Sequence, residues 1–97
     1  MFAIDITPEA IEDLRSYTRR DQKRIIDEVE SCLRHEPNRE TRNNKRLRPN
    51  RLAEWELRVG AFRVFYDTDE AHSAVKIEAI GHRQGNCLYV RGEEFQL

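Results

Sequence analysis

Arginine side chains recur where the sequence predicts a β-hairpin. The stretch Trp55–Tyr66 alternates apolar and polar residues, and it carries Arg58 and Arg63 at positions that project from a sheet. A second predicted strand ends in the pair His82-Arg83. The guanidinium group of arginine binds phosphate through two parallel hydrogen bonds. This pattern predicts a phosphate receptor, and nucleic acid is the first partner to consider.

Two of these arginines are candidates for a direct role in phosphate chemistry. Arg63 and Arg83 lie on different predicted strands but can converge on one phosphate, where they would stabilise the charge of a pentacoordinate intermediate. The alternative is that both make structural ion pairs with nearby carboxylates such as Glu56, Glu78 or Asp67. The sequence leaves both interpretations open.

His82 and Tyr89 are the candidates for proton transfer. His82 is the one histidine at a predicted strand end, and an imidazole can act as a general acid or base near neutral pH. Tyr89 follows Arg83 in the chain, so we expect it to reach the same cleft and there to stack on a base or donate a proton. The alternatives are a surface histidine and a tyrosine that packs under the C-terminal segment.

A block of positive charge surrounds the start of the hairpin. Residues 37–63 hold eight basic and three acidic side chains, whereas the whole chain has a net charge of −1. We expect RNA-phosphate contacts from the basic side chains Lys45, Arg46, Arg48, Arg51 and Arg58. The alternative is a solvated loop or a surface that pairs with an acidic protein.

The composition is that of one small, heavily charged globular domain. The chain has 97 residues, 38% hydrophobic and 36% charged, so we expect a single domain over residues 1–97. No apolar run is long enough for a membrane span, and no signal peptide is recognised. Cys32 and Cys87 lie far apart, which favours two free thiols in a cytoplasmic protein. Metal-ligand spacings and glycine-rich phosphate loops are absent, so we expect no metal and no cofactor.

The periodicity of the chain predicts the elements that position these side chains. Alternation indicates a short strand over 2–6, and two helices begin at Thr7-Pro8 and at Thr18, the second ending at Pro37. Further strands are expected at 55–59, 62–67 and 75–81, with a short one at 45–48, an irregular segment at 83–88 and a tail at 89–95 along a sheet edge. The expected fold class is α+β: a strand, a two-helix hairpin, then a mainly antiparallel sheet of three to four strands.

Strand alternation divides the hairpin into two faces. The apolar face, which we expect to meet the helices, consists of Trp55, Leu57, Val59, Phe62, Val64 and Tyr66. The opposite face carries Glu56, Arg58, Arg63 and Phe65. If that second face lies open, it forms a cleft of mixed charge with one aromatic ring.

The ordered set of these motifs resembles the RelE/ParE superfamily of bacterial toxins. The set consists of Lys45-Arg46-Leu47-Arg48, Trp55 to Gly60, Phe62 to Tyr66, Ile80-Gly81-His82-Arg83 and Tyr89, and it covers nearly the whole chain. The resemblance implies a RelE-like fold and a toxin that a cognate antitoxin protein holds inactive.

For the RelE branch, the resemblance implies cleavage of mRNA on the ribosome, without a cofactor. The 2′-hydroxyl of the substrate attacks the adjacent phosphate and the 5′-oxygen leaves. On that template Arg63 holds the scissile phosphate, Arg83 is the second arginine and Tyr89 stacks on or activates the nucleotide. His82 lies beside Arg83, at a place where related toxins vary.

One departure from the RelE pattern falls on the predicted strand before the hairpin turn. RelE-type nucleases often carry lysines where this chain has Glu54 and Glu56, and a glutamate reverses the local potential. Glu56 can serve as the base itself, or Lys45, Arg46 or Arg48 can supply the charge. The alternatives are a ParE-like toxin that binds and poisons DNA gyrase without catalysis, and a partner-binding domain without toxicity.

Overall fold

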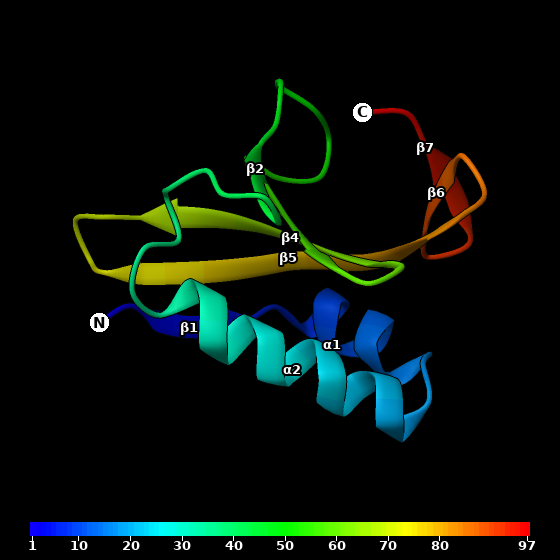
Figure 1. Ribbon diagram of the computed structural model, residues 1–97, viewed down its shortest axis with the longest axis horizontal. Helices are drawn as coiled ribbons and strands as arrows, with labels where there is room; N and C mark the ends of the chain where they lie inside the picture. The colour runs from blue at the N-terminus through cyan, green and yellow to red at the C-terminus, as the bar shows by residue number, and fades with distance from the viewer.

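The fold is a seven-stranded sheet with two helices against one of its faces (Figure 1). The computed structural model describes all residues from Met1 to Leu97. The elements in chain order are β1 (Ala3–Ile6), α1 (Pro8–Arg15), α2 (Arg19–Leu33), β2 (Asn44–Arg46), β3 (Trp55–Val59), β4 (Phe62–Asp69), β5 (Ala74–Gln84), β6 (Cys87–Val90) and β7 (Glu93–Phe95). This arrangement confirms the predicted α+β class.

Both helices begin at the threonines that the sequence predicts. The hydroxyls of Thr7 and Thr18 each accept a hydrogen bond from the amide three residues ahead, at 3.1 and 3.2 Å. Each hydroxyl satisfies an amide that has no partner within the helix, and Pro8 preforms the first turn of α1. The second helix ends at Leu33, earlier than the predicted end at Pro37. No helix combines the length and apolar character needed to cross a membrane.

Strand β5 organises the sheet because other strands pair with both of its edges. Strand β4 runs antiparallel along one edge. On the other edge, β1 runs parallel to the first part of β5 and β6 runs antiparallel to its last part. Strands β2 and β7 lie at the two ends of the order β2-β3-β4-β5-β6-β7.

The sheet is larger than the three to four strands predicted. Strand β5 continues to Gln84, and β6 and β7 form where the sequence predicted an irregular segment and a tail. Two-residue turns explain the difference. Gly85 has a φ of 63°, and Arg91 and Gly92 have φ of 55° and 75°. Positive φ at these turn positions suits the right-handed twist of two paired strands, so each turn returns the chain directly into a hairpin.

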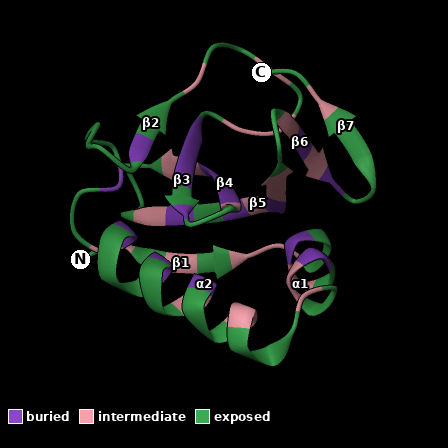
Figure 2. Ribbon diagram, turned by 45° about the vertical axis from the view of Figure 1, so that its right-hand side comes forward, coloured by how far each residue is buried: buried purple, intermediate pink, exposed green.

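A hydrophobic core fills the space between the helices and the sheet (Figure 2). The helices contribute Ala10, Ile25, Val29 and Leu33, and the β3–β4 hairpin contributes Trp55, Leu57, Val59, Val64 and Tyr66, with Phe62 packed at the edge. The predicted apolar face of the hairpin is therefore confirmed.

The opposite face of the sheet is covered, which corrects the expectation of an open cleft. Phe65 is fully buried there in a second cluster with Ala79, Leu88 and Val90. Apolar side chains of residues 47–53, together with Phe95 of β7, pack against this cluster. Glu56 and Arg63 keep only 4% and 8% of their surface exposed. The loop between β2 and β3 and the β6–β7 hairpin thus form a second, thinner layer over the sheet.

Candidate nucleic-acid interface

Three arginines lie on the sheet face that points away from the helices. In the register of the sheet, Arg58 on β3 is opposite Arg63 on β4, and Arg63 is opposite Gly81 on β5. Arg83 follows Gly81 by two residues, so its side chain leaves the same face. The structure therefore places Arg63 and Arg83, the two arginines proposed for phosphate chemistry, on one face together with Arg58.

Arg63 is the most buried member of this arginine cluster. Its Nη1 donates hydrogen bonds to two backbone carbonyls of the β3–β4 turn, both at 2.8 Å, and its buried Nε has no partner. Burial lowers the pKa of Arg63, and the charges of Arg58 and Arg83 lower it further, whereas Glu56 opposes the shift. The turn thus fixes a guanidinium group among like charges, a repulsion that a bound anion would relieve.

Nearby carboxylates do not neutralise the cluster. Glu56 is buried, and its Oε1 lies 4.0 Å from Arg58 Nε, at the limit of an ion pair. Neither Arg63 nor Arg83 forms an ion pair with a carboxylate, so the structural salt bridges of the alternative interpretation are not formed. Lys45 lies opposite Glu56 in the β2–β3 register and adds a positive charge on this face.

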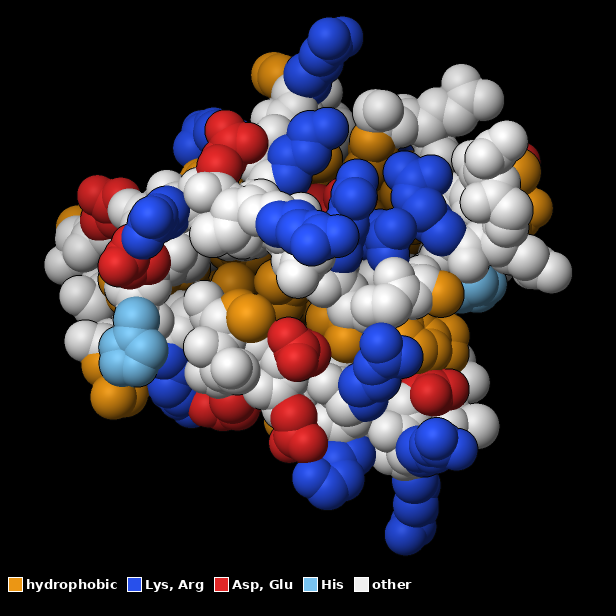
Figure 3. Space-filling view, in the orientation of Figure 1, with side chains coloured by type: hydrophobic (Ala, Val, Ile, Leu, Met, Phe, Trp, Pro, Cys, Tyr) orange, Lys and Arg blue, Asp and Glu red, His pale blue; other side chains and the backbone are white.

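Exposed basic side chains surround the arginine cluster. Figure 3 shows Lys and Arg side chains gathered above the sheet, on the side away from the helices. Lys45, Arg48 and Arg58 are exposed, and neither Lys45 nor Arg48 is paired with a carboxylate. These three predicted RNA-binding residues are therefore available to an external anion.

Two other predicted RNA-binding residues are engaged within the protein. Arg46 lies over the ring of Trp55, with its guanidinium carbon 5.7 Å from the ring centroid. Arg51 forms an ion pair with Glu93 at 3.0 Å and lies 4.6 Å from the ring centroid of Phe95. Arg51 thereby ties the β2–β3 loop to β7, so part of its charge is already compensated.

His82 and Tyr89 lie on the other face of the sheet, toward the helices. They are paired directly between β5 and β6, and their rings stack with centroids 5.8 Å apart. His82 Nδ1 is 2.8 Å from the hydroxyl of Tyr17, whereas Arg83 is paired with Leu88. The expectation that Tyr89 reaches the cleft of Arg83 is therefore wrong, because neighbouring residues of a strand point to opposite faces.

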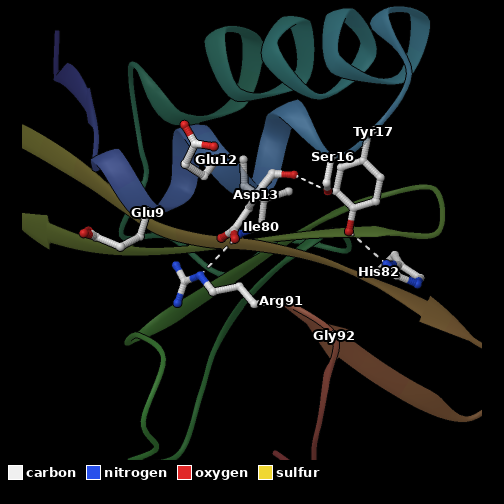
Figure 4. A pocket seen from close by; sticks show the side chains of 9 residues that line it. All are labelled: Glu9, Glu12, Asp13, Ser16, Tyr17, Ile80, His82, Arg91 and Gly92. Carbon is white, nitrogen blue, oxygen red and sulfur yellow. Dashed lines mark hydrogen bonds and ion pairs between the residues drawn. The ribbon is translucent and has the colours of Figure 1, made fainter.

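Sequence reasoning missed Asp13, which joins α1 to the end of the sheet. Its carboxylate is buried and accepts hydrogen bonds from Ile80 N at 3.1 Å and from Arg91 Nε at 2.9 Å. Figure 4 shows this ion pair at the base of a pocket of about 600 Å³, near the Tyr17–His82 contact. The available signal was the position of Asp13 on the apolar stripe of α1, where an acid needs a partner.

A family profile identifies the family of the chain. Residues 4–86 match the profile described as the ParE toxin of the type II toxin–antitoxin system parDE. The chain belongs to the ParE toxin family. This membership confirms the superfamily resemblance, and it makes the protein a toxin of a type II toxin–antitoxin system. No curated protein matches the sequence of this ParE-family toxin.

Solved structures similar to this ParE-family toxin are toxin–antitoxin complexes. A chain of the RelBE2 complex of Mycobacterium tuberculosis is 27% identical with a TM-score of 0.73, covering 84% of this chain and 98% of that one. A chain of the archaeal RelE–RelB complex of Pyrococcus horikoshii is 22% identical with a TM-score of 0.68, covering 87% and 97%. The second likeness shows the fold alone. Both confirm the RelE-like architecture, and the first is consistent with an antitoxin partner.

Proposed function

We propose that this toxin is a ribosome-dependent endoribonuclease that cleaves mRNA in the cytoplasm and so inhibits translation. The arginine cluster of Arg58, Arg63 and Arg83 carries this proposal. Three adjacent strands supply positive charges to one face, and burial and mutual repulsion lower the pKa of the central arginine. Three guanidinium groups beside one carboxylate leave an excess of positive charge, which favours binding of a phosphate, above all in the doubly charged state of phosphoryl transfer.

The chemical step needs few groups of the protein. The 2′-oxygen of the substrate forms a bond to phosphorus and the bond from phosphorus to the 5′-oxygen breaks. Arg63 and Arg83 stabilise the charge that develops on the phosphoryl oxygens. Glu56, buried beside Arg58, accepts the proton of the 2′-hydroxyl through one bridging water, and a second water supplies a proton to the leaving oxygen. His82 and Tyr89 have no part in this step, because they lie on the other face.

The exposed basic residues extend this site along the RNA. Lys45 and Arg48 lie beyond the arginine cluster on β2 and the loop that follows it. Contacts from these side chains to flanking phosphates would make RNA binding depend steeply on salt concentration. The cognate antitoxin blocks the same face by placing acidic or apolar residues over it.

The role proposed for Glu56 gives the first prediction. Replacing Glu56 with Gln keeps the size of the side chain but removes the base, so mRNA cleavage on ribosomes should fall by roughly 100-fold or more. Cleavage rates in a purified translation system measure the effect. Glu54→Gln removes an exposed acid two residues away and serves as the control. Equal rates for Glu56→Gln and the wild type would show that Glu56 is not the base.

A second candidate function is non-enzymatic poisoning of DNA gyrase. Two observations favour it: Glu54 and Glu56 stand where RelE-type nucleases often carry lysines, and the structure separates His82 and Tyr89 from Arg83. Under this alternative, the basic face binds a protein–DNA complex without cleaving a phosphodiester bond.

One paired experiment tests the two candidates together. The toxin is induced in cells and the 5′ ends of mRNA are mapped, while the purified toxin is assayed for inhibition of gyrase supercoiling. The proposed function predicts new 5′ ends within coding sequences and unimpaired supercoiling. Intact transcripts during growth arrest, with supercoiling blocked by stoichiometric toxin, would replace it with the gyrase alternative.

A further inference from the structure

A pocket at the β3–β4 turn extends the basic face around the edge of the sheet toward α2. Its volume is about 370 Å³. The residues that line it are Arg24, Glu28, Asn43, Arg58, Val59, Gly60 and Arg63. Three guanidinium groups from three elements therefore meet one carboxylate, and the pocket carries an excess of positive charge.

Arg24 reaches this pocket from the middle of α2 and lies against Gly60. Two of its guanidinium nitrogens are 2.6 and 2.8 Å from the position that a Cβ atom on Gly60 would occupy. Gly60 also has a φ of 60°, a conformation that favours glycine. Because Gly60 has no side chain, the guanidinium of Arg24 can pack directly against the turn. Arg24 forms no ion pair with a carboxylate.

Arg63 also lines this pocket, and its environment is the second reason to assign an anion to it. The residue is only 8% exposed, and its Nε donor has no acceptor in the protein. Arg63 lines the same pocket as Arg24, so its fixed positive charge acts on an anion in the pocket, and the pocket adjoins the arginine cluster.

We propose that Arg24 and Arg58 form a second phosphate subsite beside Arg63, which holds the phosphodiester next to the one bound at Arg63 and Arg83. The inference rests on the proposed function, because it makes the RNA pass from the sheet face over the β3–β4 turn to α2. A forked guanidinium pair suits the tetrahedral oxygens of phosphate. Continuity with the arginine cluster favours RNA over an acidic segment of a protein partner as the occupant.

The test is binding of a short, fluorescently labelled single-stranded RNA to the purified toxin, measured by anisotropy over a series of salt concentrations. Arg24→Gln removes the charge at the pocket, and Arg24→Lys keeps the charge without the fork. The control is Arg19→Gln, an equal charge change on the same helix at an exposed residue that does not line the pocket. Arg83→Gln tests, in the same binding measurement, whether the arginine cluster itself contacts RNA.

We expect Arg24→Gln to weaken RNA binding roughly two- to fivefold, the effect of one exposed ion pair. The slope of log affinity against log salt should fall by about 0.7, the value for one lost contact to single-stranded nucleic acid. Arg19→Gln should leave the slope unchanged, and Arg24→Lys should restore it.

Three outcomes would overturn the inference, and they are distinguishable. If Arg83→Gln weakens RNA binding but Arg24→Gln leaves the slope unchanged, the second subsite is absent and the proposed function stands. If the wild-type toxin shows no affinity for RNA at low salt, the inference fails, whereas the proposed function is decided separately by cleavage of mRNA on ribosomes. A loss of antitoxin binding in Arg24→Gln with unchanged RNA binding would assign the pocket to a protein carboxylate and would also overturn the inference.

Discussion

Arg63 is the residue whose surroundings in the structure support the proposed function most directly. The β3–β4 turn holds its guanidinium through two carbonyl groups, while burial and two neighbouring arginines disfavour its charge. Within a folded domain such an arrangement is unfavourable on its own. Under the proposed function, binding of an RNA phosphate makes the arrangement favourable, and the free toxin holds Arg63 in place before the RNA arrives.

Arg83 is better suited than the buried Arg63 to a substitution that tests the mechanism, because Arg83 is only half-buried and makes no ion pair. Arg83→Ala should relieve growth arrest when the toxin is expressed, since it removes one of the two charges that stabilise the reacting phosphate. Its melting temperature should stay within a few degrees of the wild type. Arg42→Ala, at an exposed loop arginine without an ion pair, is the control. A folded Arg83→Ala protein of full toxicity would remove Arg83 from the mechanism.

The ionisation of Glu78 should make the free energy of unfolding depend on pH. Burial raises the pKa of Glu78 above its usual value of 4.5, and nearby Asp67 adds to the shift, against the opposing charge of Lys76. The folded protein therefore disfavours the ionised form, and the stability that the neutral carboxyl contributes below pH 4.5 is lost as pH rises through the folded-state pKa.

Glu78→Gln should consequently raise the free energy of unfolding at pH 7, because glutamine carries no charge at any pH. The gain should shrink as pH falls and disappear below about pH 4.5, the usual pKa of the group. Urea unfolding at several pH values measures it, with the exposed, unpaired Glu40→Gln as the control. A gain independent of pH would contradict the assigned electrostatic cause.

At the scale of elements, Asp13 fastens the C-terminal hairpin to α1. One carboxylate oxygen accepts from Ile80 N of β5 and the other accepts from Arg91, which also donates to the carbonyl of Glu78. On the far side, the Arg51–Glu93 ion pair joins the same hairpin to the β2–β3 loop. The β6–β7 hairpin is thus held at both faces of the sheet.

Asp13→Ala should lower the free energy of unfolding by about 2–3 kcal/mol, since it leaves a buried amide and a guanidinium without their acceptor. Amide hydrogen exchange should also accelerate in β6 and β7 more than in β3 and β4. The control is Asp27→Ala, which breaks an exposed pair with Lys23 and should change stability by less than about 1 kcal/mol. Equal effects of the two substitutions would show that Asp13 does not fasten the hairpin.

The sequence predicted the first part of the fold well because its signals are local. Thr7, Pro8 and Thr18 identify the helix starts directly, and alternation from Trp55 to Tyr66 assigns the buried face of the hairpin. Signals of this kind act over a few residues and depend little on the rest of the chain.

The C-terminal part of the candidate site depends on register, which the sequence signals only through its turns. A two-residue turn at Gly85 places Tyr89 opposite His82. A longer, irregular connection would have allowed Tyr89 to lie with Arg83. A register shift by one residue moves a side chain to the other face, so an error in the turn became an error in the site. The covered second face depended likewise on long-range packing of Phe65 with Leu88 and Val90.

At the scale of the whole molecule, a net charge of −1 conceals a division into regions of opposite charge. Basic side chains gather above the sheet (Figure 3), whereas the pocket beside α1 is lined by Glu9, Glu12 and Asp13 (Figure 4). Such a division orients a polyanion toward one face of the toxin and away from the other.

The most direct test of the account uses purified toxin, ribosomes programmed with a defined mRNA, and the same mRNA with a single 2′-deoxynucleotide at the mapped cleavage position. We expect rapid cleavage of the all-ribose message and none at the deoxy position, because the attacking 2′-hydroxyl is absent there. Arg83→Ala should leave both messages intact. An all-ribose message that stays intact with wild-type toxin would contradict the central claim that the arginine cluster acts on an RNA phosphate.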